Sequence, residues 1–188
     1  MDDLVIKLDK KVVQKALSYL QGMPNEAPKA IARAMNRAIS SAKTEAGRAI
    51  RQVYTVKTRD FTQTVKLVRA KPNSLEAQFS SRSFENSLSY AHFKYSPKSP
   101  TTGSNQKPVK AEIRKGSPFI VDKGFVYNDN VFRREGKSRL PIFVKTGPTV
   151  PQMLNTDNIV ESVSNKAQDT FEKRISHEVN ALLTGKVK

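Results

Sequence analysis

Few residues of this 188-residue chain are of types that carry acid–base, nucleophilic or metal chemistry. The sequence contains no cysteine, which excludes disulfides, thiol nucleophiles and zinc–thiolate sites. Its two histidines, His92 and His177, are far apart in the sequence, so the i, i+4 histidine pair that holds zinc on a helix is absent. His92 stands among aromatic residues in a strand-like stretch and is expected to be packed or at a strand edge. His177 is expected to be solvated on a helix.

Acidic residues in the middle of the chain offer one further possibility, a divalent-metal nuclease site built from Asp122, Asp129 and Glu135. Their spacing matches no metal-binding motif. The sequence also contains no P-loop, no dinucleotide fingerprint and no nucleophile elbow. We therefore expect a protein that is not an enzyme and that needs no metal and no cofactor.

The net charge of +16 is concentrated in two blocks. Residues 29–82 carry twelve Lys and Arg against three acids, a net of +9, and residues 94–145 carry twelve against four, a net of +8. Such a field favours an anionic partner, either nucleic acid or an acidic protein surface, and the alternative is a solvated basic surface. The candidate contact residues are Arg33, Arg37, Arg48, Arg51, Arg133, Arg134, Lys137 and Arg139.

The sequence gives no sign of a membrane protein. No apolar run approaches the roughly 20 residues that span a bilayer. The first residues, MDDLV, lack the basic and apolar regions of a signal peptide. We expect no membrane partner.

Residues 28–54 carry the strongest helical pattern, with apolar residues recurring every three or four positions and Pro28 suited to a first turn. The apolar stripe is rich in alanine, so another element can approach it closely. We expect this stripe to form a subunit interface, with the alternative that the chain's own elements cover it. Its members are Ile31, Met35, Ala38, Ala42, Ala46 and Ala49.

The other helical patterns are a short helix at 9–21, within an N-terminal element of residues 1–22, and a C-terminal helix at 157–184 capped by Thr156 or Asp157. Thr58 is expected to cap one helical turn that ends at Phe61. Between the long helices, residues 64–145 form a β region, in which residues 96–108 are a mobile loop rich in proline. The expected strands are 65–69, 75–79, 89–95, 109–114, 119–121, 125–127, 130–134 and 140–145, the first two forming a hairpin.

These elements predict an α+β fold in one domain, residues 1–188, with the long N-terminal helix and the C-terminal helix packed on a mostly antiparallel sheet. Gly147, Pro148 and Pro151 are expected to be turn residues that shape the fold and lead the chain into its last helix.

Two stretches of the sequence resemble a known family. The first is AIARAMNRAI at residues 30–39, followed by an Ala-rich helix and VKTR at 56–59. The second is FRREGKSRLPI at 132–142, which continues to TGPTVPQM at 146–153. Both are similar to the phage minor tail protein Z family, the tail-completion proteins of lambda-like phages. The resemblance covers nearly the whole chain and depends on the order and spacing of the motifs.

The resemblance implies a structural virion protein, not an enzyme, that acts in tail completion at the head-proximal end of the tail and in head–tail joining. It implies assembly in the host cytoplasm and contacts with other tail and neck proteins. Related small α+β connector proteins form rings, so we expect copies of this chain to form a ring, a hexamer by analogy. The basic residues then meet either the phage DNA end or an acidic neighbouring subunit. We favour the protein contact, because tight phosphate binding would slow sliding DNA.

Two alternatives remain beside this interpretation. One is a sequence-independent DNA-binding protein, although its basic blocks would be expected to contain more aromatic residues for base stacking. The other is a neighbouring head–tail connector or tail-terminator subunit, which sequence patterns separate poorly from a completion protein.

Overall fold

The computed structural model describes residues 4–7, 14, 18, 25–83, 87–99 and 107–184. The predicted short helix at 9–21 therefore lies outside the described residues except at Gln14 and Ser18, which are helical. The centre of the predicted loop, residues 100–106, lies outside them as well. The first residue of that loop is a strand end, because Ser96 closes strand β5 (Lys94–Ser96).

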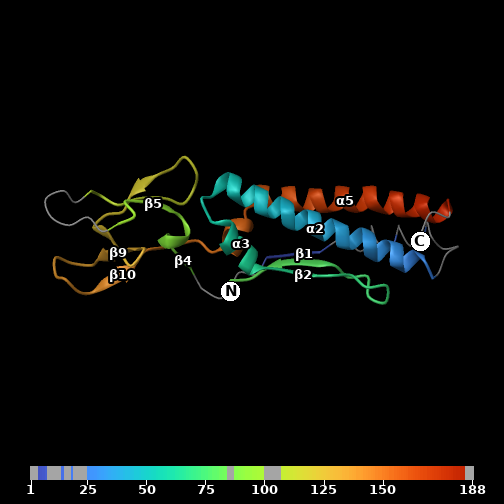
Figure 1. Cartoon of the computed structure of the whole chain (residues 1–188), viewed down its shortest axis with the longest axis horizontal. Helices are drawn as coiled ribbons and strands as arrows, with labels where there is room; N and C mark the ends of the chain where they lie inside the picture. Colours follow the sequence, from blue (N-terminus) through green and yellow to red (C-terminus); the bar gives the residue numbers. More distant parts are fainter. Residues whose placement is uncertain are drawn as a thin grey trace.

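Two long antiparallel helices form one half of the molecule (Figure 1). Helix α2 spans Ala27–Val53 and helix α5 spans Asp157–Leu183, each within one residue of its predicted bounds. Pro28 occupies the first turn of α2, where its missing N–H costs no hydrogen bond. Asp157 lies in the first turn of α5, where its charge complements the helix dipole. The apolar periodicity of both segments thus predicted the helices correctly.

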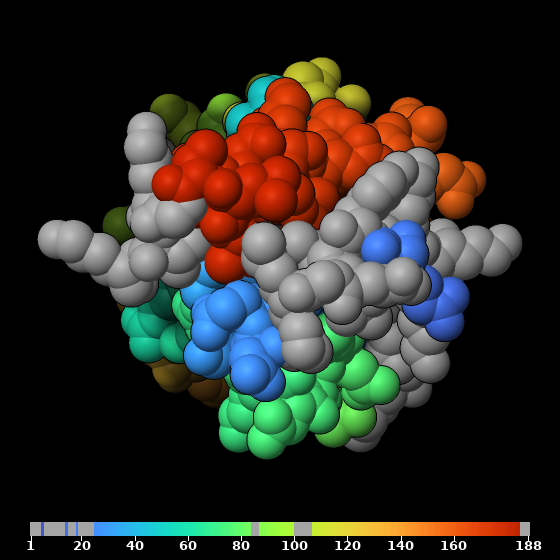
Figure 2. Space-filling view, turned by 90° about the vertical axis from the view of Figure 1, so that its right-hand side faces the viewer, coloured from blue at the N-terminus to red at the C-terminus, as the bar shows by residue number. Residues whose placement is uncertain are grey.

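A three-stranded antiparallel sheet packs beside α2. Its strands are β1 (Leu4–Lys7), β2 (Val65–Val68) and β3 (Gln78–Ser81), in the order β1-β3-β2. The predicted hairpin is confirmed, although its second strand begins three residues later than expected. Strand β1 was not predicted. Figure 2 shows α5, α2 and the segment that joins β2 to β3 as successive layers at this end of the molecule.

Helix α3 (Thr58–Thr64) links α2 to the hairpin and is longer than the single turn expected. The prediction that Thr58 caps it is wrong, because Lys57 is the N-cap residue and Thr58 is already helical. Helix α3 lies close to α2 at Gly47, where a Cβ atom would stand 2.9 Å from Phe61 Cε1. The absence of a side chain at Gly47 therefore permits the contact between the two helices.

The other half of the molecule contains short antiparallel strands (Figure 1). The predicted strand at 89–95 is wrong, since β4 (Leu88–Ser89) is followed by a 3-10 turn, η1 (Tyr90–His92). The turn allows the backbone to change direction between two different sheets, because β4 pairs with β11 (Thr146–Gly147) and β5 pairs with β6 (Lys110–Glu112). The strands are β4 (Leu88–Ser89), β5 (Lys94–Ser96), β6 (Lys110–Glu112), β7 (Phe119–Ile120), β8 (Gly124–Tyr127), β9 (Asn130–Arg134), β10 (Ile142–Val144) and β11 (Thr146–Gly147), with η1 at Tyr90–His92.

The fold class is confirmed as α+β, and the described strands are divided among four small antiparallel sheets. A continuous cluster of buried residues joins the two halves of the molecule, because it includes Ile50 of α2, Val163 of α5 and Phe93 of the β region. A second cluster lies between α2, α5 and the hairpin and includes Met35 and Phe171. Within the described part of the chain, no helix combines the length and apolarity of a bilayer span.

Candidate functional site

The described residues do not bring potential metal ligands together in groups of three or more His, Asp or Glu. Asp122 and Asp129 lie in the turns before and after β8, and Glu135 follows β9. The possible nuclease site therefore has no metal-binding cluster in this part of the chain. His92 Nδ1 lies 3.0 Å from Oδ1 of the buried Asp60, so this histidine links η1 to α3. His177 is exposed on α5, as predicted.

Two of the basic residues predicted on α2 have acidic partners along the line of contact between α2 and α5, which we call the seam. Arg33 donates from Nε and Nη2 to Glu178 Oε2 of α5, at 2.9 and 2.6 Å. Arg48 donates from Nε and Nη2 to the two carboxylate oxygens of Glu45, at 3.0 and 2.7 Å. Both guanidinium groups are therefore neutralised within the chain, which makes them weaker candidates for contact with an external anion.

Glu45 connects the two helices at one end of the seam. Its carboxylate is buried, with the residue only 8% exposed, and Oε1 also accepts a hydrogen bond of 3.0 Å from Ser162 Oγ of α5. The hydrogen bond from Arg48 lowers the pKa of Glu45 from its ordinary value of 4.5, and it outweighs the opposing effect of burial. The charged form of Glu45 is therefore favoured chiefly by Arg48 of the same helix, with a smaller contribution from Ser162 of α5.

The lowered pKa of Glu45 predicts a loss of stability in acid. Because the folded-state pKa lies below the unfolded value, the stabilisation is fully present above the ordinary value of 4.5 and is lost as the pH falls through the folded-state pKa. The Glu45→Gln variant is expected to lose less stability than the wild type between about pH 7 and about pH 3. Urea unfolding followed by circular dichroism measures this difference. The exposed Glu161→Gln substitution on α5 is the control for removing a carboxylate, and equal pH dependence in Glu45→Gln and the wild type would contradict the prediction.

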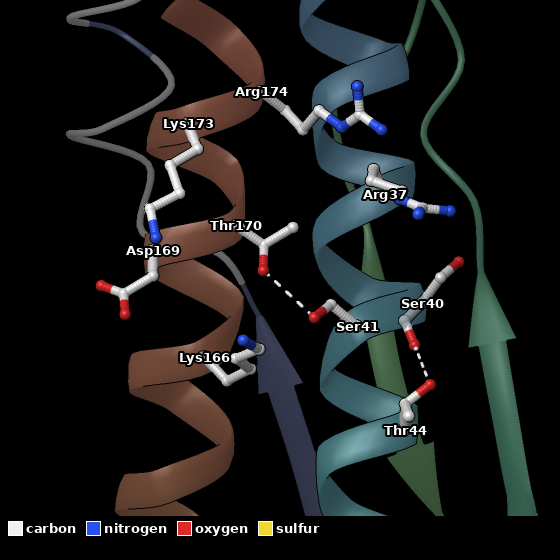
Figure 3. Close-up of a pocket in the computed structure, with 9 residues that line it drawn as sticks. All are labelled: Arg37, Ser40, Ser41, Thr44, Lys166, Asp169, Thr170, Lys173 and Arg174. Atoms are coloured by element: carbon white, nitrogen blue, oxygen red, sulfur yellow. Dashed lines mark hydrogen bonds between the residues drawn. The ribbon is translucent and has the colours of Figure 1, made fainter.

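Between these two ion pairs the seam opens into a polar groove with a volume of about 430 Å³ (Figure 3). Arg174 reaches from α5 toward α2, whereas Arg37 points from α2 away from α5 (Figure 3). Lys166 lies lower in the groove, and the side chains of Lys173 and Asp169 point away from α2 (Figure 3). The residues that line the groove are Arg37, Ser40, Ser41, Thr44, Lys166, Asp169, Thr170, Lys173 and Arg174. Sequence reasoning named Arg37 alone, since the α5 side chains come opposite α2 only in the fold.

The fourth basic residue predicted on α2, Arg51, lies in the last turn of the helix, where a cation complements the helix dipole. A positive charge is favourable at this position within the chain itself, so Arg51 gives no separate indication of an external anionic partner.

The apolar stripe of α2 is not a free surface. All six residues predicted to form a subunit interface are buried inside the chain, with exposures between 0% and 7%. The physical reason is that α5, α3 and the hairpin together use the whole width of the stripe. The structure therefore agrees with the alternative interpretation, in which the chain's own elements cover the apolar stripe. The residues concerned are Ile31, Met35, Ala38, Ala42, Ala46 and Ala49.

The second basic group lies around β9 and the turn that follows it. Arg133 is exposed and stands opposite Phe143 of β10, while the guanidinium of Arg134 lies 5.1 Å from the centre of the Phe125 ring. Lys137 and Arg139 are exposed in the turn before β10. The structure thus places all four of these basic residues at one three-stranded sheet, away from the groove on the seam.

This sheet, in the order β10-β9-β8, presents an apolar outer face that sequence reasoning missed. Phe125, Phe132 and Val144 stand opposite one another across the three strands, so their side chains share one face. Phe125 and Phe132 stack with their ring centres 5.9 Å apart, and Tyr127 meets Phe132 edge-on at 6.1 Å. Tyr127 is 53% exposed and Val144 41%. We call these residues, together with Ile142 of the same face, the outer face: Phe125, Tyr127, Phe132, Ile142 and Val144.

The alternation of Phe125 and Tyr127 in the sequence was a signal of this face, but it did not distinguish an outer face from a core-facing one. The opposite face of the same sheet holds the buried Val126 and Val131. Both faces of the sheet therefore carry apolar residues, and the second face is covered at Val126 and Val131 but not at Phe143, which is 54% exposed.

The residues predicted to shape the last turn lie at two structural features. Gly147 belongs to β11, and a Cβ atom there would stand 3.0 Å from Ile113 Cδ1 and 3.1 Å from Phe93 Cε2. Pro148 precedes and Pro151 opens the short helix α4 (Val150–Leu154), which was not predicted. Thr149 caps α4 through a reciprocal capping box with Gln152.

Comparison with known proteins gives one result. The family model for prophage minor tail protein Z matches residues 10–187, which include both long helices and all strands of the β region. No curated protein and no solved structure matches the chain.

Proposed function

The chain belongs to the prophage minor tail protein Z family, and we propose that it completes the head-proximal end of the phage tail as one subunit of a ring. It is a structural protein of a bacteriophage tail and thus a virion component. We further propose that it is assembled in the host cell, prepares the tail for joining to the head, and contacts other tail and neck proteins. By analogy with related connector proteins, the ring has six subunits.

The outer face of the β10-β9-β8 sheet is the observation that best supports this role. Exposed apolar surface of this kind, made of aromatic and branched side chains, is typical of protein–protein contacts. Among the residues that the structure describes, six of the ten exposed large hydrophobic residues lie between residues 119 and 144, in the β region of the molecule. The basic residues Arg133 and Arg134 on the central strand add charged groups to the sheet, a pattern common in interfaces.

Charge distribution supports contact between copies of the chain. The β region carries a net charge of +8 over residues 94–145, whereas α5 carries five acids against three basic residues, a net of −2. Asp157, Glu161 and Glu172 are exposed on α5. Contact between the β region of one copy and α5 of the next joins two different surfaces, and a heterologous contact of this kind closes into a ring when the rotation permits.

The substitution Val144→Asp tests the proposal, because it places a carboxylate on the outer face, opposite Phe132 of the central strand. A charge buried without a partner in an interface typically costs 2 kcal/mol or more, about a thirtyfold loss of affinity. In phage that lack their own copy of the gene, we expect the variant to lower the yield of infectious particles at least about tenfold.

Val68→Asp is the matched control. Val68 is also an exposed strand valine, at 44% exposure, but it lies in β2, outside the outer face. The isolated proteins should unfold within about 0.5 kcal/mol of the wild type in both cases, since both positions are exposed. The proposal is wrong about this surface if Val144→Asp supports infection as well as Val68→Asp does.

A further inference from the structure

The groove between α2 and α5 has a composition that the structural role in the tail does not require. Its lining holds four cationic side chains and one carboxylate, together with four hydroxyl side chains, and includes no large apolar residue. From this composition we propose that the groove is a binding site for phosphate groups, and specifically for those of a nucleic-acid backbone. The inference stands on the geometry of the seam and does not depend on the proposed position in the tail.

The seam shows which cations have partners in the chain and which do not. Moving one helical turn along α2 from Arg33 leads to Arg37, and moving one turn along α5 from Glu178 leads to Arg174. The ion pair between Arg33 and Glu178 is therefore followed by two arginines. The groove therefore receives positive charge from both helices, which a bound anion would balance.

No ion pair is formed by Arg37, Lys166, Lys173 or Arg174 with the described residues. The ion pairs of Arg33 and of Arg48 lie at either side of this stretch, and the one acid of the groove lining, Asp169, points away from α2 (Figure 3). The groove is consequently the part of the seam at which positive charge stays available to a ligand.

The hydroxyl groups narrow the kind of ligand. Ser40 and Thr44 donate to the backbone carbonyls of Asn36 and Ser40, and Thr170 donates to Ser41 Oγ (Figure 3). Ser41 accepts that bond and keeps its own proton for donation. The groove thus offers guanidinium, ammonium and hydroxyl donors, which suits a ligand that only accepts hydrogen bonds, as phosphate does.

An acidic protein segment fits this groove less well than a phosphate backbone. Protein interfaces usually combine charged groups with an apolar core, which the groove lacks. Contacts to phosphate come mainly from Arg, Lys, Ser and Thr side chains, which are the residues found here. Since no aromatic side chain lines the groove for stacking on bases, binding should not depend on base sequence.

The test compares two doubly substituted full-length proteins. Arg37→Gln/Arg174→Gln removes two charges from the groove while retaining the side-chain stems. Lys66→Gln/Lys110→Gln removes two charges from exposed strand positions outside it. Fluorescence anisotropy with a labelled DNA duplex of random sequence, at low and at moderate salt, measures affinity and its salt dependence. The groove variant is expected to bind at least about tenfold more weakly, with a salt slope smaller by about two, whereas the control changes by less than about threefold.

A second arm uses pyrophosphate and a poly-glutamate peptide in isothermal titration. Duplex binding that is weakened in the groove variant alone supports a nucleic-acid backbone as the natural phosphate ligand. If the groove variant binds pyrophosphate more weakly but binds the duplex as the wild type does, the natural ligand of the site is a free phosphate compound. Three results would overturn the inference. The first is an equal loss of duplex affinity in the two variants, and the second is no binding of either phosphate ligand. The third is tighter binding of poly-glutamate than of DNA at the groove. Each of these results leaves the test of the outer face unaffected.

Discussion

Replacing Phe171 by alanine is expected to lower the free energy of unfolding by about 3–5 kcal/mol. Phe171 is fully buried, at 0% exposure, in the cluster between α5, α2 and the hairpin, where Ile31 and Met35 are also buried. Removing the ring leaves a cavity that two rigid helices cannot close, so both the transfer energy and the packing contacts of the ring are lost.

Urea unfolding followed by the helical circular dichroism signal measures the effect of Phe171→Ala, with the slope against denaturant confirming that the same surface is exposed. Phe171→Leu should cost much less than the alanine substitution, because more of the volume remains. Leu183→Ala is the control on the same helix, since Leu183 is 67% exposed, and should change stability by no more than about 0.5 kcal/mol. A loss below about 1 kcal/mol in Phe171→Ala would show that the two helices do not pack as described.

Replacing Phe93 by alanine is expected to destabilise the whole chain, by about 3–5 kcal/mol, in a single transition. Phe93 is 2% exposed and belongs to the cluster that also contains Ile50 of α2 and Val163 of α5. Because this cluster is continuous between the two halves of the molecule, a cavity in the β region should weaken the helices as well. The result tests the prediction that the chain is a single domain.

Two signals report on the two halves of the molecule during this experiment. Far-ultraviolet circular dichroism follows α2 and α5. Tyrosine fluorescence follows mainly the β region, which holds three of the five tyrosines, Tyr90, Tyr95 and Tyr127, in a chain that has no tryptophan. The two unfolding curves should coincide in the wild type and shift together in Phe93→Ala. Phe143→Ala is the control in the same region, as Phe143 is 54% exposed. Separate transitions would show that the β region folds independently of the helices.

The two proposed contact surfaces lie on different elements of the molecule and differ in chemistry. The outer face is apolar and aromatic and belongs to the short strands β8 to β10, whereas the groove is polar and cationic and belongs to the long helices. Substitutions in one should therefore leave the other intact, because sites that share no partners behave additively. A protein with both properties is able to hold a neighbouring subunit and a phosphate backbone at the same time.

The sequence by itself determined the local elements. The three- and four-residue spacing of apolar residues predicted both long helices to within one residue, and proline with asparagine at residues 72–73 predicted the hairpin turn. These features depend on neighbours within a few positions of one another, and such neighbours are visible in a linear pattern. The short strands were placed less well, since β4 and β5 pair with distant segments and the intervening backbone turns between sheets.

Only the tertiary structure decided which side chains are free. Four arginines of α2 looked equivalent in the sequence, but Glu178 from the far end of the chain neutralises Arg33, while Arg37 lines the groove together with Arg174. The alanine stripe looked open to a partner and is covered by α5 and α3. The outer face became visible once three strands were aligned in register. Periodicity fixes the face of an element on which a residue lies, and what stands opposite that face depends on contacts between segments far apart in the sequence.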